Sequence, residues 1–135
     1  MASKNAIKVI HELPLANYNP IDDVASSDIV RFDIIPDRVC YRGAIRFTGV
    51  VARRERAESC STPWHREAYD KLVEVENSDW LNEIYADTGE SYRKYWKEKH
   101  HYMIGVNDAP IVEVIADSWE LMPEEKGEWP RIKLT

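Results

Sequence analysis

The chain has 135 residues, 44% of them hydrophobic, and carries a net charge of −6 at pH 7. This length predicts one domain, 1–135 with residues 1–5 flexible, whose core needs neither a metal nor a disulfide. The negative charge disfavours unspecific binding to nucleic acid or to an anionic membrane, because both depend on neutralising phosphate groups. There are two cysteines, no apolar run near the roughly 20 residues of a membrane span, and no apolar signal segment, so we expect a soluble cytoplasmic protein.

The first half of the chain carries extended segments. Residues 6–13 predict a short strand, and 15–28 predict a loop because they are rich in Asn, Asp, Ser and Pro. Apolar and polar residues alternate over 28–35, which predicts a strand with one apolar face. A second extended run follows at 39–54, and we expect Gly43 to mark a bulge that shifts its register.

Helical spacing replaces this alternation near residue 62. Thr62 and Pro63 fit an N-cap followed by proline at the first helical position, so the pattern predicts a helix that continues through residue 76. Ser78 or Asp79 can cap a second helix, and residues 91–99 predict a third. The three helices together form an insert of about 35 residues.

The last third of the chain returns to a two-residue period. Segments 101–106 and 111–121 flank the turn sequence Asn-Asp-Ala-Pro and predict a hairpin, and 131–134 predicts a short edge strand. Strands at both ends of a chain with helices between them are typical of the α+β class. We therefore expect an antiparallel sheet of four to six strands, with two or three helices inserted between the strand groups and packed on one face.

The start of the first predicted helix holds the chemical candidates. A cysteine near a helix N-terminus can have a lowered pKa, so Cys60 could act as a nucleophile with His65 as its base. A buried cysteine beside a surface histidine explains the same residues, and no catalytic-cysteine signature is present. A pocket between the helices and the sheet would bind its ligand through Cys60, Trp64, His65, Arg66, His101 and Trp119.

Metal and cofactor motifs are absent from the sequence. There is no CxxC and no HxxxH, and the adjacent His100 and His101 would point to opposite faces of a strand. Glycine-rich phosphate loops and the GxSxG nucleophile motif are missing too. Glu113 and Asp117 share a predicted strand face but lie about 13 Å apart, too far for an acid–base pair on that strand alone. We expect no metal and no cofactor.

Charge is segregated along the chain. Residues 38–58 carry a net charge of +4 and 92–102 carry +3, whereas 67–90 carry −7 and 108–128 carry −6. Pairing between sheet and helices would explain these blocks. A basic, aromatic face would instead bind an acidic protein surface or a small anionic ligand, through Arg53, Arg54, Arg56, Tyr95 and Trp96. Stacking of RNA on these aromatics is a further option, which the overall acidity disfavours.

Two functions remain open at this point. The first is a non-catalytic protein-interaction module that binds a partner through its charge-segregated surface. The second is a small enzyme or small-molecule-binding protein with a site near residues 60–66 and a strand histidine. The positions of Cys60, His65 and His101 separate the two, because convergence in a cleft favours the second and dispersal over the surface favours the first.

Overall fold

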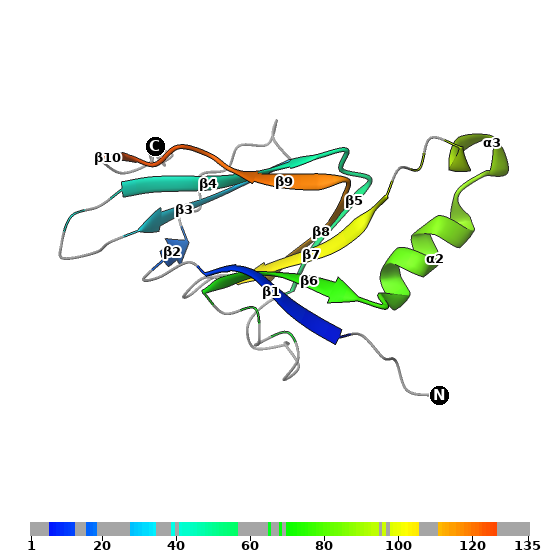
Figure 1. Ribbon diagram of the computed structural model, residues 1–135, viewed down its shortest axis with the longest axis horizontal. Helices are drawn as coiled ribbons and strands as arrows, with labels where there is room; N and C mark the ends of the chain where they lie inside the picture. The colour runs from blue at the N-terminus through cyan, green and yellow to red at the C-terminus, as the bar shows by residue number, and fades with distance from the viewer. Residues whose placement is uncertain are drawn as a thin grey trace, which may run out of the picture.

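The computed structural model has two antiparallel five-stranded sheets that pack against each other (Figure 1). It describes residues 6–12, 16–18, 28–34, 39, 41–56, 65, 68, 70–94, 96, 98–105 and 111–126. Within these ranges the chain is mostly β, and none of the helices is long and apolar enough to cross a membrane.

The first sheet has the strand order β1-β6-β7-β8-β5. Its strands are β1 (Ala6–Glu12), β6 (Lys71–Glu76), β7 (His100–Gly105), β8 (Ile111–Ala116) and β5 (Ala52–Arg56). The second sheet has the order β10-β4-β3-β2, and β9 also pairs with β4. Its strands are β10 (Glu125–Lys126), β4 (Tyr41–Thr48), β3 (Ile29–Ile34), β2 (Ala16–Tyr18) and β9 (Ser118–Leu121). Helices α2 (Asp79–Asp87) and α3 (Glu90–Arg93) connect β6 to β7.

Two strands cross from one sheet to the other at a common corner. β4 continues into β5 and β8 continues into β9, and residues 49–51 lie opposite only 116–117, which makes a bulge. Gly49 has φ +69°, and a Cβ there would collide with the Asp117 carboxylate, so the bulge requires glycine. Lys99 Nζ binds the Gly49 carbonyl at 3.1 Å and Asp117 Oδ1 at 2.6 Å, which ties the two strands together.

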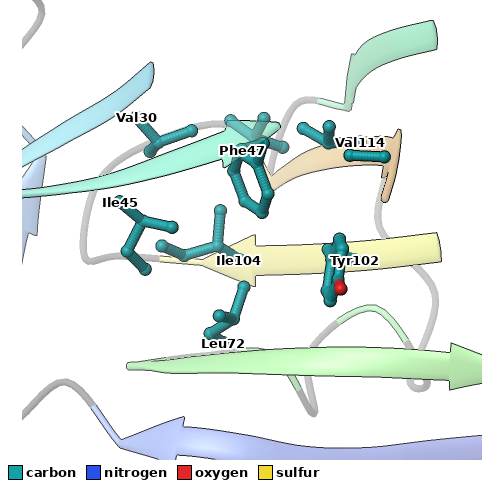
Figure 2. Packing of buried hydrophobic residues seen from close by; sticks show 9 residues of the cluster. Val30, Ile45, Phe47, Leu72, Tyr102, Ile104 and Val114 are labelled. Atoms are coloured by element: carbon teal, nitrogen blue, oxygen red, sulfur yellow. The ribbon is translucent and has the colours of Figure 1, made fainter. Parts of the chain in front are cut away.

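The main core lies between the two sheets (Figure 2). The second sheet contributes Val30, Ile45 and Phe47, and the first sheet contributes Leu72, Tyr102, Ile104, Val112, Val114 and Ala116. Full burial of a large apolar side chain stabilises a fold by roughly 1.5–3 kcal/mol, so this layer holds the sheets together. Burial also raises the pKa of Tyr102 to about 12, with Glu74 and Asp117 adding to the effect.

The outer face of the first sheet, which points away from the second sheet, is buried as well. A second cluster forms there from Ala68, Val73, Val75, Met103 and Ile111. Every residue of β8 is buried, so the centre of the first sheet is covered on both sides. The buried polar residues His101 and Glu113 lie in this doubly covered region.

Several sequence predictions are confirmed. The strands expected at 6–13 and 28–35 are β1 and β3, and Ser78 caps the helix α2. The hairpin of the last third is the β7–β8 pair, which runs from His100↔Ala116 to Ile104↔Val112, but its second arm ends at Ala116 because Ser118–Leu121 form β9 of the second sheet. Its turn, the start of the first predicted helix at 62–64 and the edge strand expected at 131–134 lie outside the described residues.

The first predicted helix is wrong in its second half. Residues 71–76, with the sequence KLVEVE, form β6 in the interior of the first sheet. The segment also has a period of two, with the β-branched Val73 and Val75 on one face, and its pairing with β1 and β7 favours the strand over the helical spacing that Leu72 and Val73 satisfy. Asp70, with φ +56°, lies directly before the strand.

Other features differ from the sequence expectations as well. The strands form two sheets instead of one, and Ala16–Tyr18, inside the loop predicted at 15–28, form the strand β2. The β3–β4 register runs unbroken through Gly43, and the bulge lies at Gly49 instead. The helices do not form a layer on one sheet face: α2 has no buried residue and extends away from the sheets (Figure 1), and α3 has only four residues. The helix expected at 91–99 is therefore much shorter in the described part of the chain.

Candidate functional site

Two polar side chains interrupt the apolar outer face of the first sheet. Side chains alternate along a strand, so His101 shares this face with Met103, and Glu113 shares it with Ile111 and Ile115. His101 is 1% exposed and Glu113 is 0% exposed. An unpaired charge at this depth would be costly, so the contacts of Glu113 decide whether the arrangement is stable.

Glu113 is held by an arginine from the neighbouring strand. Arg54 lies directly opposite Glu113 in the β5–β8 ladder. Its Nε donates to Oε2 at 2.8 Å and its Nη2 donates to Oε1 at 3.1 Å. Burial by itself would raise the pKa of Glu113, but hydrogen bonds from His101 and Arg54 outweigh it and lower the pKa to about 2. Glu113 is therefore a carboxylate at neutral pH.

His101 connects Glu113 to a serine. His101 Nε2 lies 2.8 Å from Glu113 Oε1, and His101 Nδ1 lies 2.6 Å from Ser78 Oγ. A carboxylate only accepts, so in the neutral ring Nε2 carries the proton and Nδ1 accepts from the Ser78 hydroxyl. Ser78 Oγ in turn accepts from the Leu81 amide at 3.0 Å. Every polar atom along this line has a partner.

Local sequence explains the position of Ser78. It follows β6 and precedes α2, and Asn77 between them has φ +56°, a conformation that asparagine tolerates better than most residues. Serine is among the preferred N-cap residues because its oxygen accepts a first-turn amide. Ser78 is 5% exposed, so this cap is buried against His101.

A second histidine approaches the same carboxylate from another segment. His65 Nε2 lies 3.9 Å from Glu113 Oε2, and His65 is 2% exposed. The Ala68 amide donates to the His65 carbonyl at 3.1 Å, as in a helical turn. Burial lowers the pKa of His65; Glu113 opposes this shift, and Arg56, Arg54 and His101 add to it. We refer to Arg54, His65, Ser78, His101 and Glu113 as the Glu113 cluster.

Trp80 covers the cluster from α2. Its ring lies 5.1 Å from the His101 ring in an edge-on arrangement, and the Arg54 guanidinium carbon lies 4.0 Å from the Trp80 ring centre. The Arg54 side chain is 40% exposed, whereas Glu113 beneath it is almost completely buried. Arg54 is thus the member of the cluster that reaches solvent.

The described residues do not form a metal site. No three or more of their His, Cys, Asp and Glu side chains are arranged to hold a metal ion. Arg54 also donates to both oxygens of Glu113, which places a positive charge where a cation would have to bind.

The structure brings together only some of the predicted ligand-binding residues. His65 and His101 meet at Glu113, while Cys60, Trp64 and Arg66 lie outside the described residues. Trp119 packs against the core between the sheets, on the opposite side of the first sheet from His101, with its ring 5.9 Å from that of His11. The segment 111–121, predicted as one strand, is divided at Asp117, and Trp119 belongs to β9 of the second sheet.

The predicted partner-binding arginines make contacts within the molecule. Arg53 donates to the Ile29 carbonyl and pairs with Glu55 at 3.3 Å, and Arg54 belongs to the Glu113 cluster. Arg56 is half-buried at the end of β5, and Tyr95 lies outside the described residues. Trp96 packs edge-on against Tyr85 at 5.1 Å, far along the chain from the arginine strand.

Two central residues of the cluster, Ser78 and Glu113, were not among the sequence candidates. The sequence predicts Ser78 only as a helix cap. It places Glu113 too far from Asp117 for a pair on one strand and leaves a partner from another element open. The available signal was a polar residue at an apolar position: His101 and Glu113 occupy the outer-face positions of two otherwise apolar strands. Their partners come from β5 and from the β6–α2 junction, which no strand pattern reveals.

Comparison of the chain with protein-family models, curated proteins and solved structures gives no match. The function must therefore be inferred from the chemistry of the site.

Proposed function

We propose that this protein is a small enzyme or small-molecule-binding protein whose working site is the Glu113 cluster. The observation that carries the proposal is the meeting of two histidines and an arginine at one buried carboxylate. These groups come from β5, β7, β8 and the segment around residue 65. Ionisable groups in a desolvated cluster are the ones that proteins use for acid–base chemistry.

The energetics of burial support a functional rather than a structural reason for the cluster. Desolvating a carboxylate and its partners costs several kcal/mol per ion, and well-packed apolar residues often stabilise a fold as well or better. Apolar side chains would fit the outer-face positions of His101 and Glu113, since Val75, Met103, Ile111 and Ile115 already surround them in the sheet. Departures from the local pattern are expected chiefly at functional sites.

A ligand of small size and negative charge fits this site best. Arg54 uses Nε and Nη2 for Glu113, and its 40% exposed side chain leaves Nη1 for an anionic group such as a carboxylate. The neighbouring Trp80 ring offers an apolar surface beside that group. His65 and His101 would then exchange protons with the part of the ligand that reaches deeper.

A fragment screen read by nitrogen NMR of the imidazole rings tests this proposal. Small carboxylates should shift the His65 and His101 ring resonances, and Arg54→Met should weaken their binding at least about tenfold, since a charge-assisted pair is lost. His100 is the internal control. Its Nδ1 lies 2.9 Å from Glu74 Oε2, and neither residue belongs to the Glu113 cluster. Fragments that shift all histidines equally, or none, would count against the proposal.

The protein-interaction module remains a second candidate, supported by the α2–α3 segment. Residues 79–93, which span both helices, contain four carboxylates and one basic residue, Arg93. Tyr85 is 43% exposed and Tyr92 is 67% exposed, and the helix α2 has no buried residue. An acidic helix with exposed aromatic rings fits a partner whose surface is rich in lysine and arginine.

Affinity purification with matched variants tests the second candidate. Tyr92→Ser combined with Asp87→Lys should abolish capture of a basic partner from host lysate, and about 0.5 M salt should weaken the wild-type capture. Val9→Ser is the control, because Val9 is 49% exposed on β1. Equal capture by all three proteins would reject α2–α3 as the docking surface.

A further inference from the structure

Ser78, His101 and Glu113 form one continuous hydrogen-bonded line. The Ser78 hydroxyl donates to His101 Nδ1 across 2.6 Å, and His101 Nε2 donates to Glu113 Oε1 across 2.8 Å. The base is thus within reach of a hydroxyl and is itself oriented by a third group. This is the geometry by which an activated nucleophile is recognised, whatever the order of the residues along the chain.

The setting of Ser78 favours negative charge on its oxygen. Ser78 is the N-cap of the nine-residue helix α2, and the Leu81 amide donates to Oγ at 3.0 Å. The first amides of a helix carry partial positive charge at its N-terminus, which favours an oxyanion formed beside Ser78. The helix dipole acts in the same direction.

We propose that Ser78 is the nucleophile of an acyl-transfer reaction on small carboxylic esters, with His101 as its general base and Glu113 as the residue that positions His101. The proposal rests on the proposed function, because it uses the same cluster as a small-molecule site. Ser78 is 5% exposed and Trp80 covers His101, so the acyl group must be short.

Each step of the reaction balances with an ester and water alone. Ser78 Oγ attacks the carbonyl carbon and its proton passes to His101 Nδ1. The carbonyl re-forms, the ester C–O bond breaks, and His101 returns the proton to the leaving alcohol. Water then loses a proton to His101, attacks the acyl-serine and releases the carboxylic acid, while Ser78 Oγ regains its proton. Glu113 stays ionised throughout and stabilises the imidazolium.

Covalent labelling of the full-length protein tests the nucleophile. The protein is treated with diisopropyl fluorophosphate and, separately, with p-nitrophenyl acetate, and the modified residue is located by peptide mass spectrometry. We expect modification at Ser78, none in Ser78→Asn, and labelling at least about 100-fold slower in His101→Gln, which is the usual contribution of a general base. Ser78→Asn keeps an acceptor at the helix cap, and Ser118→Ala on β9 is the matched control for an exposed serine.

The outcomes separate this inference from the proposed function. Ser78 left unmodified in the folded wild type overturns the nucleophile, even when fragments shift the His65 and His101 resonances. Equal labelling rates in wild type and His101→Gln overturn the role of the base. If either variant fails to fold, as judged by circular dichroism, the wild-type peptide map decides alone. A merely structural cap would give no acyl-serine at position 78.

Discussion

Replacing Glu113 by glutamine tests the electrostatics of the cluster most directly. The side chain keeps its shape and can still accept from His101, but it loses the negative charge that faces Arg54. The pKa of Glu113 falls from 4.5 to about 2 in the folded protein, which corresponds to about 3 kcal/mol at neutral pH. Arg54 is 40% exposed, and solvent screens its share, so we expect Glu113→Gln to lower the free energy of unfolding by about 2–3 kcal/mol at pH 7.

The pH dependence of this loss fixes its cause. Because folding depresses the pKa of Glu113, the carboxylate stabilises the fold above the unfolded-state pKa and loses this effect as the pH falls from 4.5 towards 2. The difference between wild type and Glu113→Gln should therefore shrink to about half by pH 3. Urea denaturation at both pH values measures it. Glu55→Gln is the control, since its pair with Arg53 is 46% exposed on the carboxylate side and should cost less than about 1 kcal/mol. A loss of the same size at pH 7 and pH 3 would refute the reasoning.

Three further changes probe other parts of the structure. Folding lowers the pKa of His65, so below pH 6.5 the unfolded chain binds a proton more readily than the folded protein, and stability should decrease. Thermal melts between pH 7 and 5.5 should therefore show a smaller decrease in melting temperature for His65→Gln than for wild type. Lys99→Met leaves the Asp117 carboxylate and the Gly49 carbonyl without their shared donor, which should cost about 1.5–3 kcal/mol in urea denaturation; a change below about 0.5 kcal/mol would reject the corner contact. Gly49→Ala places a Cβ against Asp117 at φ +69° and should lower stability by at least about 1–2 kcal/mol, and an unchanged melting temperature would contradict the bulge geometry.

The sequence predicted local structure best where a single period was present. Alternation identified β3 and the β7–β8 hairpin, and the cap at Ser78 marked the start of α2. The sequence prediction failed at residues 71–76, where Leu72 and Val73 satisfy a helical and an extended pattern at once. The neighbouring strands determine the conformation of that segment. β6 pairs with β1 on one side and with β7 on the other, and both sets of backbone hydrogen bonds stabilise the extended form.

The charges are segregated along the chain, but the fold brings part of the basic and part of the acidic stretches next to each other. Part of the basic stretch 38–58 lies beside the acidic stretch 108–128 in the β4–β9 and β5–β8 ladders. Arg46 pairs with Glu120 at 3.8 Å, and Arg54 pairs with Glu113. In these two pairs, arginines of the basic stretch form ion pairs with carboxylates of the acidic stretch inside the molecule, although the sequence pattern also allowed them to face a partner.

The sequence by itself determined the antiparallel strand periods and the helix cap, because these depend on neighbours a few residues apart. Only the tertiary structure decided that the strands divide into two sheets, since that division depends on the corner at Gly49 and Asp117. It also decided the site. Arg54, His65, Ser78, His101 and Glu113 come from distant parts of the chain, and strand pairing across the first sheet places them around one carboxylate. Contacts of that kind follow from register between strands, which local patterns do not encode.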